Sequence, residues 1–385
     1  MLVNNKKKVL LGLSGGVDSG VAAYLLKQEG YDVTGCFMRN WDSLANQDIM
    51  GNPTIMDSIC PQEVDYQDAV KVAETVGIPI LRIDFVKEYW DNVFTAFIDE
   101  YTKGRTPNPD ILCNKYIKFK SFYDYAKEMG FDYLATGHYA KIIDLNDEKL
   151  MAKALDDNKD QTYFLSQVDK NVLDEVLFPL GEYTKEQIRE IALDINLSIA
   201  TKKDSTGICF IGERDFKEFL KNYIPAKTGQ IIDVSSKQVL GDHEGVLYYT
   251  IGQRKGLRIG GNRGPWFVVG KDVVKNELYV SNVDENGWLY SDSALISDLN
   301  WFKEVAEGEK VYAKFRYRQA DNIVYIHKKG DDVLVKFDQP IAAITPGQEA
   351  VFYNEAGIVL GGGVIEDSFV NGQAISSRLK EALGE

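Results

Sequence analysis

The stretch LSGGVDSG, residues 13–20, lies at the junction of two apolar patterns. Residues 9–11 before it form the continuous apolar run of a buried strand, and residues 21–29 after it repeat apolar side chains at helical spacing. Glycines at such a junction predict an anion-binding turn, because backbone N–H groups converge there and the helix start adds about half a positive charge. The sequence therefore predicts a phosphate site at residues 13–20.

Each polar residue of this turn has a chemical use at a phosphate site. Gly15 and Gly16 allow a phosphate to approach the backbone with no Cβ in the way. Ser14 and Ser19 supply hydroxyl donors, and Asp18 is placed to cap the helix or to help hold Mg²⁺. The stretch lacks the lysine of G-x-x-x-x-G-K-[ST] and does not fit G-x-G-x-x-G, so it is neither an ordinary P-loop nor a dinucleotide fingerprint.

Composition restricts the classes of function that fit the chain. With 385 residues, 44% of them hydrophobic and 26% charged, it is long enough for two or three globular domains. A net charge of −14 excludes a general polycation, so any RNA site must be a local basic patch. The candidate patches, each of which also fits an ordinary solvated surface, are Lys115 with Lys118 and Lys120, Lys202 with Lys203, Arg254 with Lys255 and Arg258, and Arg316 with Arg318.

The four cysteines, Cys36, Cys60, Cys113 and Cys209, are widely spaced and form no C-x-x-C pair. That spacing argues against a disulfide scaffold and against a self-contained zinc site, and we expect no resident metal. A reducing cytoplasm is the natural setting for such a chain. No stretch approaches the roughly 18 consecutive apolar residues of a membrane span, so we expect neither export nor a membrane partner.

The first half of the chain alternates short apolar runs with longer amphipathic stretches. This βαβα alternation predicts an α/β domain with a doubly wound parallel sheet that is covered on both faces. Ligands of such domains bind at the carboxyl ends of the strands. The predicted strands are residues 9–13, 33–38, 80–85 and 133–136, and the predicted helices are residues 21–29, 66–76, 89–101 and 119–129.

After about residue 215 the segments become short, alternating and punctuated by glycine. We expect three domains: residues 1–216 as the nucleotide-binding catalytic domain, 217–289 as a small mixed domain, and 290–385 as an antiparallel β-barrel or sandwich. Residues 329–332 form a predicted hairpin turn. The predicted strands of the two later domains are residues 230–234, 246–251, 266–269, 277–280, 311–318, 323–328, 333–337, 350–353 and 358–360.

Two segments each carry one cysteine in a polar, basic setting: GRTPNPDILCNKYIKF, residues 104–119, and KKDSTGICFIGERDF, residues 202–216. Such a setting favours an exposed thiol with a pKa below its usual value of about 8.5. For either cysteine alone, a half-buried inert thiol is the competing interpretation. Together with a phosphate turn, the pair favours a role in the reaction.

The turn at residues 14–19, SGGVDS, resembles the pyrophosphate loop (PP-loop) of the ATP pyrophosphatase superfamily, whose members cleave ATP to AMP and pyrophosphate. With the two cysteine segments and six further motifs, the chain resembles the tRNA-specific 2-thiouridylases from about residue 8 to about residue 366. The further motifs are NPD (108–110), ATGHY (135–139), NKDQTYFL (158–165), TIGQRKGL (250–257), RYRQ (316–319) and TPGQ (345–348).

This resemblance implies an enzyme with an N-terminal PP-loop domain and a C-terminal, tRNA-binding β-barrel. Its implied reaction is ATP-dependent 2-thiolation of the wobble uridine in the tRNA anticodon stem-loop. ATP adenylates the 2-oxygen of the uridine, pyrophosphate departs, and sulfur then replaces the activated oxygen with release of AMP. A base must leave its stack to react, and extruding the unpaired wobble uridine requires less free energy than extruding a paired base.

The resemblance also implies the route of the sulfur. Cys209 carries a persulfide that a sulfur-relay protein delivers, and Cys113 attacks it, which frees sulfide and leaves a disulfide for a reductant to open. Direct attack by the persulfide on the activated carbon is the alternative route. Asn108 and Pro109 belong to the target-base loop, and Asp110 in the same loop is the implied general acid or base.

The remaining implied contacts are with ATP and tRNA. The ATP-binding residues are Gly12, Leu13, Ser14, Gly15, Gly16, Val17, Asp18, Ser19, Met38 and Gly137, with Mg²⁺ accompanying the nucleotide. The tRNA-binding residues are Asn108, Pro109, Asp110, His138, Lys159, Asp160, Gln161, Arg316, Tyr317 and Gln348. Core packing competes for Met38, an internal hydrogen bond for His138, and strand-surface placement for Arg316 and Tyr317. Cys36 and Cys60 have no implied role, and we expect Cys36 to be buried.

Two other functions compete with this interpretation. One is another PP-loop ligase or amidotransferase that adenylates a carboxylate, which needs no paired thiols. The other is an RNA-binding module that uses ATP only as an allosteric ligand, which needs no AMP or pyrophosphate release.

Overall fold

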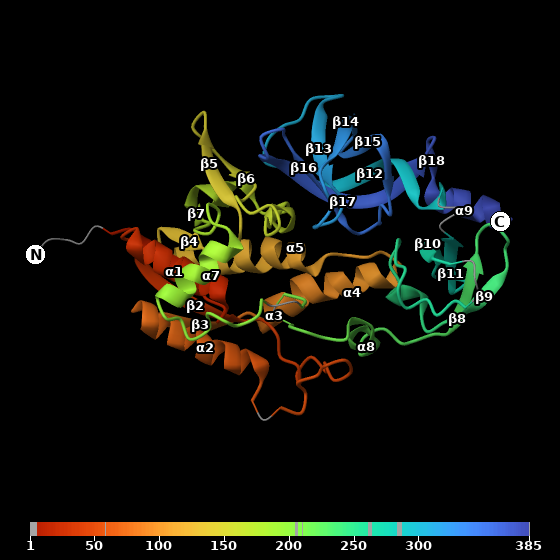
Figure 1. The fold of residues 1–385 in the computed structure, drawn as a ribbon. Coiled ribbons are helices and arrows are strands. Elements are labelled where there is room, and N and C mark those ends of the chain that lie inside the picture. The colour runs from red at the N-terminus through yellow and green to blue at the C-terminus, as the bar shows by residue number, and fades with distance from the viewer. Residues whose placement is uncertain are drawn as a thin grey trace, which may run out of the picture. The chain divides into compact units, whose positions relative to one another are not determined.

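A computed structural model describes residues 6–57, 59–204, 207–209, 211–260, 264–282 and 287–384 (Figure 1). Ser205, Thr206 and Phe210 of the second cysteine motif lie outside the described residues. The chain forms two compact units, each of which is described by itself. The first comprises the chain up to Phe94, Pro109–Phe216 and Ala356–Val359, and the second comprises Thr95–Asn108, Lys217–Glu355 and the chain from Leu360.

The first unit is built on a five-stranded sheet in the order β3-β2-β1-β4-β7, with every neighbouring pair parallel. This confirms the predicted parallel sheet. The central strand β1 is buried on both faces, as its unbroken apolar run requires. The strands are β1 (Lys8–Gly12), β2 (Asp32–Arg39), β3 (Ile80–Asp84), β4 (Tyr133–Ala135) and β7 (Val176–Leu177).

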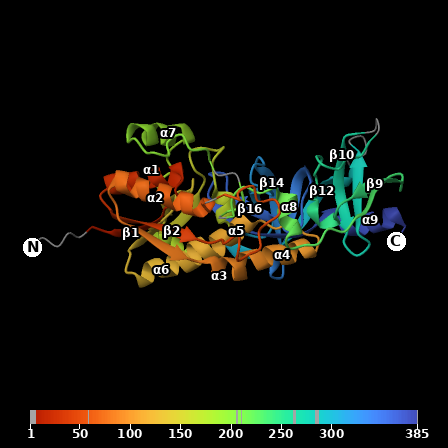
Figure 2. The ribbon, with the colours of Figure 1, turned by 90° about the horizontal axis from the view of Figure 1, so that it is seen from below.

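Helices cover both faces of this sheet, as predicted. Figure 2 shows α1, α2 and α7 on one side of β1 and β2, and α3 and α6 on the other. The core between α1 and the sheet consists of small and branched apolar side chains such as Val21, Ala22 and Val72. The helices are α1 (Val17–Gln28), α2 (Pro61–Val76), α3 (Val86–Tyr89), α6 (Phe122–Glu128) and α7 (Lys185–Asp194).

Two of the predicted helices are interrupted by π-helical turns. Residues 89–101 comprise the end of α3, the π-helix η1 and part of α4, and residues 119–129 begin inside the π-helix η2. π-Helical turns are rare and occur frequently at functional sites. The elements of this region are η1 (Trp90–Phe94), α4 (Thr95–Thr102), α5 (Pro109–Cys113) and η2 (Asn114–Ser121), of which α4 belongs to the second unit.

The order of the strands positions the glycine turn. β1 pairs with β2 on one side and with β4 on the other, so the loop that follows β1 lies where the sheet connections diverge. Ligands of open α/β sheets bind at that switch point. The first unit also contains a hairpin and two short 3₁₀ helices, namely β5 (Lys141–Leu145), β6 (Glu148–Ala152), η3 (Thr162–Leu165) and η4 (Lys170–Glu175).

The middle part of the second unit contains a four-stranded sheet in the order β10-β11-β8-β9. The strand predicted at residues 246–251 is wrong, because Val246–Tyr248 forms the 3₁₀ helix η5 and a turn follows it. An apolar run this short, between Gly245 and Gly252, does not distinguish a strand from a helical turn. The elements are α8 (Phe216–Lys221), β8 (Gly229–Asp233), β9 (Val239–His243), β10 (Trp266–Asp272) and β11 (Glu277–Asn282).

The C-terminal part of the second unit is a closed antiparallel barrel. Its sheet runs β12-β15-β14-β13-β16-β17-β18, and the further pairing of β12 with β17 closes it. The predicted hairpin turn is confirmed, since Lys329 of β14 pairs with Asp332 of β15. The elements are β12 (Tyr290–Trp301), β13 (Lys310–Lys314), β14 (Asn322–Lys329), β15 (Asp332–Ala342), β16 (Glu349–Tyr353), β17 (Val359–Val370), β18 (Gln373–Ala374) and α9 (Ile375–Leu383).

Within the described ranges, no helix has the length and apolar character that crossing a membrane requires. The domain limits expected at residues 216/217 and 289/290 stay predictions.

Candidate active site

The two glycines of the glycine turn after β1 differ in what a side chain would contact at their positions. Gly15 has a φ of +75°, and a Cβ there would lie 2.2 Å from the carbonyl oxygen of Asp65 in α2. At Gly16 the nearest atom to such a Cβ would be the Ser14 hydroxyl, at 3.4 Å. The fold itself therefore requires Gly15, whereas Gly16 leaves room for a ligand to approach the backbone.

The serines of the turn bond to the turn itself. The hydroxyl of Ser19 accepts from the Ser14 N–H at 3.2 Å and donates to the Gly16 carbonyl at 3.1 Å. The residue that caps α1 is Gly16, with no side-chain hydrogen bond, so the predicted capping role of Asp18 is wrong. Asp18 lies one residue inside the helix, where its Oδ1 accepts from Tyr139 OH at 2.9 Å and from Lys185 Nζ at 2.7 Å.

The other residues predicted to bind ATP surround this turn. The Met38 methyl group lies 3.3 Å from the position of a Cβ on Gly12, so these two residues pack together at the ends of β2 and β1. A Cβ on Gly137, just after β4, would lie 3.0 Å from the Ser19 backbone nitrogen. Leu13 and Val17 are buried in the core, which accounts for them as packing residues.

Sequence reasoning missed a cluster of charges beside the turn. Lys185, at the start of α7, is buried and lies 2.7 Å from both Asp18 and Asp204. Asp204 also accepts from Lys159 at 2.7 Å and from Arg189 at 2.8 Å. Although partial burial works against its charge, these cations lower the pKa of Asp204 to about 2. The capping box that begins α7 was the available sequence signal for this helix.

The structure brings Cys113 and Cys209 together. Their sulfur atoms are 3.5 Å apart, a hydrogen-bond contact between two free thiols that are 96 positions apart in the chain. Cys113 ends α5, and Cys209 is held by Asp110, whose Oδ1 accepts from the Cys209 N–H at 3.0 Å. The Tyr89 hydroxyl donates to the Cys209 carbonyl at 2.9 Å. All four residues belong to the first unit.

The two thiols have opposite electrostatic environments. The hydrogen bond from Cys113, followed by the charge of Lys118, lowers the pKa of Cys209. Cys113 is 0% exposed, and burial raises its pKa well above the usual value. The expectation of two exposed, acidic thiols is therefore wrong for Cys113, because its side chain at the end of α5 points into the packed interior.

Asp110 has the environment of a group that exchanges protons. Burial raises the pKa of this carboxyl, against the opposing effects of the Cys209 N–H and of Lys118. A carboxyl with a raised pKa can act as an acid or a base nearer to neutral pH than an exposed one. This environment is consistent with the role that the resemblance implies.

Lys118 and His138 complete the surroundings of the thiols. Lys118 Nζ lies 3.3 Å from His138 Nε2 and also hydrogen-bonds the side chain of Cys209. His138 is 8% exposed, with Nδ1 2.7 Å from the Thr136 hydroxyl, and burial lowers its pKa well below the usual value. Lys118 is thus part of the site and not of a solvated basic patch. Contact between His138 and tRNA stays a prediction.

The segment predicted to contact tRNA, residues 159–161, makes internal contacts. Lys159 pairs with Asp204, as described above. Asp160 is buried and accepts from the Thr162 hydroxyl at 2.8 Å and the Ala154 N–H at 3.1 Å. Gln161 Oε1 accepts from the Tyr139 N–H at 3.0 Å. These contacts shape the loop beside Asp18, and the tRNA contacts of the segment stay a prediction.

The predicted tRNA residues of the second unit lie in loops next to the barrel strands. β13 ends at Lys314, so Arg316 and Tyr317 lie beyond it. One Arg316 nitrogen donates to the Ile251 carbonyl at 2.7 Å, to the Thr345 hydroxyl at 2.8 Å and to the Ala343 carbonyl at 3.1 Å. Gln348 donates to the Thr106 carbonyl at 2.6 Å, two residues before the partly buried Asn108.

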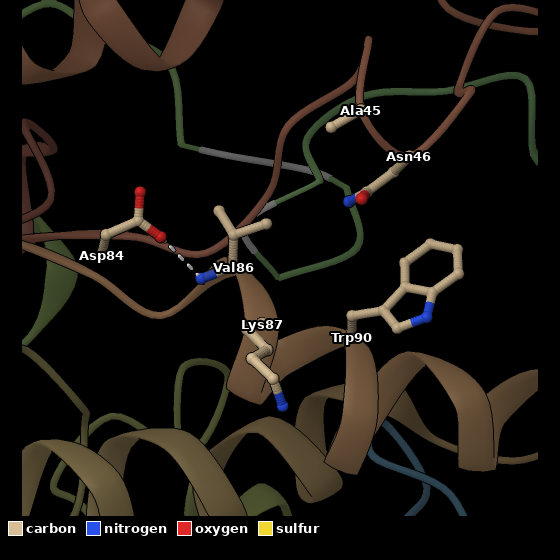
Figure 3. Close-up of a pocket in the computed structure, with 6 residues that line it drawn as sticks. All are labelled: Ala45, Asn46, Asp84, Val86, Lys87 and Trp90. Carbon is tan, nitrogen blue, oxygen red and sulfur yellow. Dashed lines mark hydrogen bonds between the residues drawn. The ribbon is translucent and has the colours of Figure 1, made fainter.

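The two remaining cysteines and the described pocket lie outside this arrangement. Cys36 is buried, as expected, and burial raises its pKa to about 12, whereas Cys60 is exposed. A shallow pocket of the first unit (Figure 3) is lined by Ala45, Asn46, Asp84, Val86, Lys87 and Trp90 and contains none of the predicted site residues. In the part of the chain that the structure describes, no three His, Cys, Asp or Glu side chains are grouped as ligands of one metal ion.

Family models match all three parts of the chain. Residues 7–213 match a tRNA methyl transferase HUP domain, residues 217–282 a tRNA methyl transferase PRC-barrel domain, and residues 291–365 an aminomethyltransferase beta-barrel domain. A tRNA-specific 2-thiouridylase of Mycoplasma capricolum is 56% identical over 94% of this chain and 99% of its own length. The chain belongs to the tRNA-specific 2-thiouridylase family.

Other members of this 2-thiouridylase family are similar over the same extent. A relative in Acholeplasma laidlawii is 53% identical, and one in Bacillus pumilus is 49% identical, each over 96% of this chain and 98% and 97% of their own lengths. The family resemblance stated from the motifs is confirmed. The thiol pair and the glycine turn of this family member lie in one structural unit. Both are formed by residues of the motifs on which the resemblance was based.

Proposed function

We propose that this protein is an ATP-dependent tRNA 2-thiouridylase that thiolates the wobble uridine through an adenylated 2-oxygen and a cysteine persulfide. The observation that carries the proposal is the 3.5 Å contact between the Cys113 and Cys209 sulfur atoms beside Asp110. A persulfide relay needs two thiols within reach of each other, and a carboxylate-adenylating ligase or a methyl transferase needs none.

The glycine turn supports the ATP half of the reaction. The start of α1 presents backbone N–H groups and a partial positive charge to a phosphate, and Gly16 leaves that approach open. Mg²⁺ in such sites is held by one or two carboxylates together with substrate phosphates, and Asp18 is the carboxylate of the turn that fits this role. The chemistry that this ion supplies is charge neutralisation on the phosphates. Lys185, 2.7 Å from Asp18, holds that carboxylate in place.

Activation is needed because the 2-oxygen of uridine is a poor leaving group. The 2-oxygen attacks the α-phosphorus of ATP, pyrophosphate leaves, and the oxygen becomes part of an AMP leaving group. Asp110 is the group that accepts or donates a proton at the base, for which its raised pKa is suited. Asn108, directly before α5, and Pro109, the first residue of α5, position the extruded base.

The sulfur half of the reaction uses the asymmetry of the two thiols. Cys209, the more acidic thiol, accepts sulfane sulfur from a donor protein and becomes a persulfide. The Cys113 thiol gives its proton to the neighbouring Asp110 carboxylate, and the resulting thiolate attacks the inner sulfur, forms the Cys113–Cys209 disulfide and expels hydrosulfide. Hydrosulfide adds to C2 of the activated uridine, AMP leaves, and a thiol reductant returns two electrons to the disulfide. Direct attack by the terminal persulfide sulfur on C2 is the alternative. Cys113 then attacks the Cys209 sulfur of the adduct, which releases the 2-thiouridine and leaves the same disulfide.

The proposed partners follow from this chemistry. They are tRNA, bound through its anticodon stem-loop, a protein that delivers sulfur as a persulfide, and a thiol reductant. A thiocarboxylate protein, the other donor that the resemblance implies, carries sulfur at the sulfide level and would need a two-electron oxidant to form the Cys209 persulfide, so the persulfide donor is the one that fits. Two free thiols in hydrogen-bond contact are stable only in a reducing compartment, for which the cytoplasm is our proposal. The tRNA contacts predicted for residues 159–161 of the first unit and for Arg316, Tyr317 and Gln348 of the second belong to the same proposal.

The test incubates the protein with unmodified tRNA, MgATP and a persulfide donor and measures 2-thiouridine by mass analysis of the nucleosides. We expect thiolation by the wild type, loss of thiolation in Cys113→Ser and Cys209→Ser, and normal thiolation in the exposed-thiol control Cys60→Ser. Thiolation at the wild-type rate in either of the first two variants refutes the persulfide route.

A second readout separates the two competing functions. We expect AMP and pyrophosphate to be released only when substrate tRNA is present. Release that needs a carboxylate substrate and no tRNA would identify a ligase, and tRNA binding with no pyrophosphate release would identify a binding module.

A further inference from the structure

The ammonium group of Lys118 lies among the reacting groups of the first unit. Its Nζ is 3.3 Å from His138 Nε2 and hydrogen-bonds the Cys209 side chain. The charged or titratable groups that face this cluster come from four places in the fold: Cys113 and Asp110 of α5, Cys209, His138 after β4, and Tyr89 of α3. Lys118 is the cation of this set at neutral pH.

The π-helix η2 explains how Lys118 reaches the thiols. η2 begins directly after Cys113, and a π-helix bonds residue i to residue i+5. Lys118 is the fifth residue after Cys113, so the wider turn brings it one turn along from that cysteine on the same side. In an α-helix the fifth residue points to a different side. We therefore attribute a functional role to this uncommon turn, which is to aim the ammonium group of Lys118 at the thiols.

His138 orients the ammonium group. A lysine ammonium can only donate, so the Lys118 contact makes His138 Nε2 the acceptor. The ring proton then lies on Nδ1, where it donates to the Thr136 hydroxyl at 2.7 Å. This arrangement needs a neutral imidazole, and burial lowers the pKa of His138 accordingly. His138 is therefore a positioning residue for Lys118.

We propose that Lys118 is a catalytic residue of the sulfur transfer, whose ammonium group holds the Cys209 sulfur as an anion ready to accept sulfane sulfur and then stabilises the hydrosulfide that Cys113 expels. The proposal deepens the proposed function and rests on it. Each step balances: the Cys209 thiolate takes the sulfane sulfur and the donor leaves as a thiolate, and in the later S–S exchange the negative charge of the Cys113 thiolate leaves on HS⁻, next to the ammonium group. No metal or further oxidant is needed.

The electrostatics of the cluster support this role. Although burial opposes the charge, the sulfur atoms and Asp110 raise the pKa of Lys118, so it stays protonated at neutral pH. After the hydrogen bond from Cys113, Lys118 is the charge that lowers the pKa of Cys209. A cation in contact with a thiolate typically lowers the thiol pKa by about 1 to 3 units. Removing it lowers the thiolate fraction of Cys209 at neutral pH.

The test measures the pH profile of Cys209 alkylation by iodoacetamide, with the modified peptide identified by mass spectrometry, in protein carrying Cys60→Ser. The matched variants are Lys118→Gln, Lys118→Arg and Lys120→Gln, because Lys120 is an exposed residue of the same helix that pairs with Asp124 at 3.0 Å. We expect the midpoint to rise by one unit or more in Lys118→Gln, to stay nearer the wild type in Lys118→Arg, and not to move in Lys120→Gln.

An unmoved midpoint in folded Lys118→Gln protein overturns the proposal. So does a midpoint for the wild type at or above about 8.5, the value of an ordinary thiol, and that measurement needs no variant to fold. Alkylation requires neither tRNA nor ATP. A failure of tRNA thiolation by the wild type therefore refutes the proposed function and leaves the alkylation result standing, whereas normal thiolation with an unmoved midpoint refutes only the role of Lys118.

Discussion

Lys185 and Asp204 form an ion pair of 2.7 Å in which the lysine side chain is only 9% exposed. The same ammonium group bonds Asp18 in the helix that follows the glycine turn, and Asp204 lies five residues before Cys209. The glycine turn and the segment that carries the accessible thiol are therefore joined through one buried cation. Removing one partner of a buried cation destabilises the folded protein. The free energy of unfolding of a variant that lacks one partner therefore tests this connection.

We expect Asp204→Asn to destabilise the first unit by about 1–2 kcal/mol at neutral pH, after a discount for partial solvent screening. Although partial burial works against its charge, the neighbouring lysines lower the folded-state pKa of Asp204 to about 2 from its ordinary value of 3.8. A depressed carboxyl contributes stability above its unfolded pKa and loses it as the pH falls through the folded pKa. Urea unfolding should therefore show a difference between the two proteins at pH 6 that disappears toward pH 2. Asp157→Asn, at an exposed carboxyl on the neighbouring turn, is the control and should unfold like the wild type.

Gly15→Ala and Gly16→Ala should separate folding from ligand approach. A Cβ on Gly15 combines a left-handed backbone with a 2.2 Å clash against Asp65, so we expect a loss of several kcal/mol or no folded protein. Gly16→Ala meets nothing closer than 3.4 Å and should keep the melting temperature within a few degrees while weakening ATP binding at least tenfold. Thermal unfolding with ATP titration measures both effects. Wild-type ATP affinity in Gly16→Ala would remove the turn from the nucleotide site.

Cys113→Ala should make Cys209 less reactive, although it removes no group from Cys209 itself. The hydrogen bond from Cys113 is the largest cause of the lowered pKa of Cys209, and a donor to a thiolate favours the charged form. Its loss raises that pKa, and each unit means about tenfold less thiolate at a pH below the midpoint. The rate of Cys209 alkylation at pH 7 measures the change. A rate equal to that of the wild type would mean that the thiols are not in contact in solution.

Arg316→Gln and Arg318→Gln test which arginine of the barrel loop meets tRNA. Arg316 donates to three protein oxygens, so its loss should lower the melting temperature of the protein, whereas the exposed Arg318 should be neutral for stability. A residue that neutralises one tRNA phosphate lowers the salt slope of binding by about one unit when it is removed. A slope that is reduced in Arg316→Gln and unchanged in Arg318→Gln, measured well below both melting temperatures, would support the contact that the resemblance implies, and an unchanged slope in Arg316→Gln would contradict it.

The elements that were predictable from sequence are those in which the buried residues form a recognisable pattern of apolar side chains, either a continuous run or a regular alternation. The apolar run before residues 13–20 predicted β1, and the alternation after residue 290 predicted most of the barrel. The run at residues 246–251 failed because a short apolar segment is compatible with a 3₁₀ turn as well as a strand. Helix α7 was missed although Thr184 and Gln187 form a capping box at its start.

The sequence predicted which residues form the candidate site, but it did not predict how deeply each is buried or which charges surround it. The motifs selected Cys113, Cys209 and Asp110, and the structure places these three side by side. The burial of Cys113 was not predictable, because the charged residues of its motif that suggest exposure, Asp110 and Lys118, themselves lie beside the thiols. Lys118 was placed with Lys115 and Lys120 on a surface patch, since a charge pattern contains no sign of a π-helical turn.

The unequal burial of Cys113 and Cys209 decides which sulfur an incoming molecule meets. Cys113 has no exposed surface, whereas Cys209 is partly accessible. In the proposed reaction, a thiol reductant that opens the Cys113–Cys209 disulfide in this conformation must therefore form its mixed disulfide with Cys209, and Cys113 is released first as the leaving thiol. Sulfur delivery and disulfide repair would then use the same atom, so we expect the donor protein and the reductant to compete for one docking position and to act in turn.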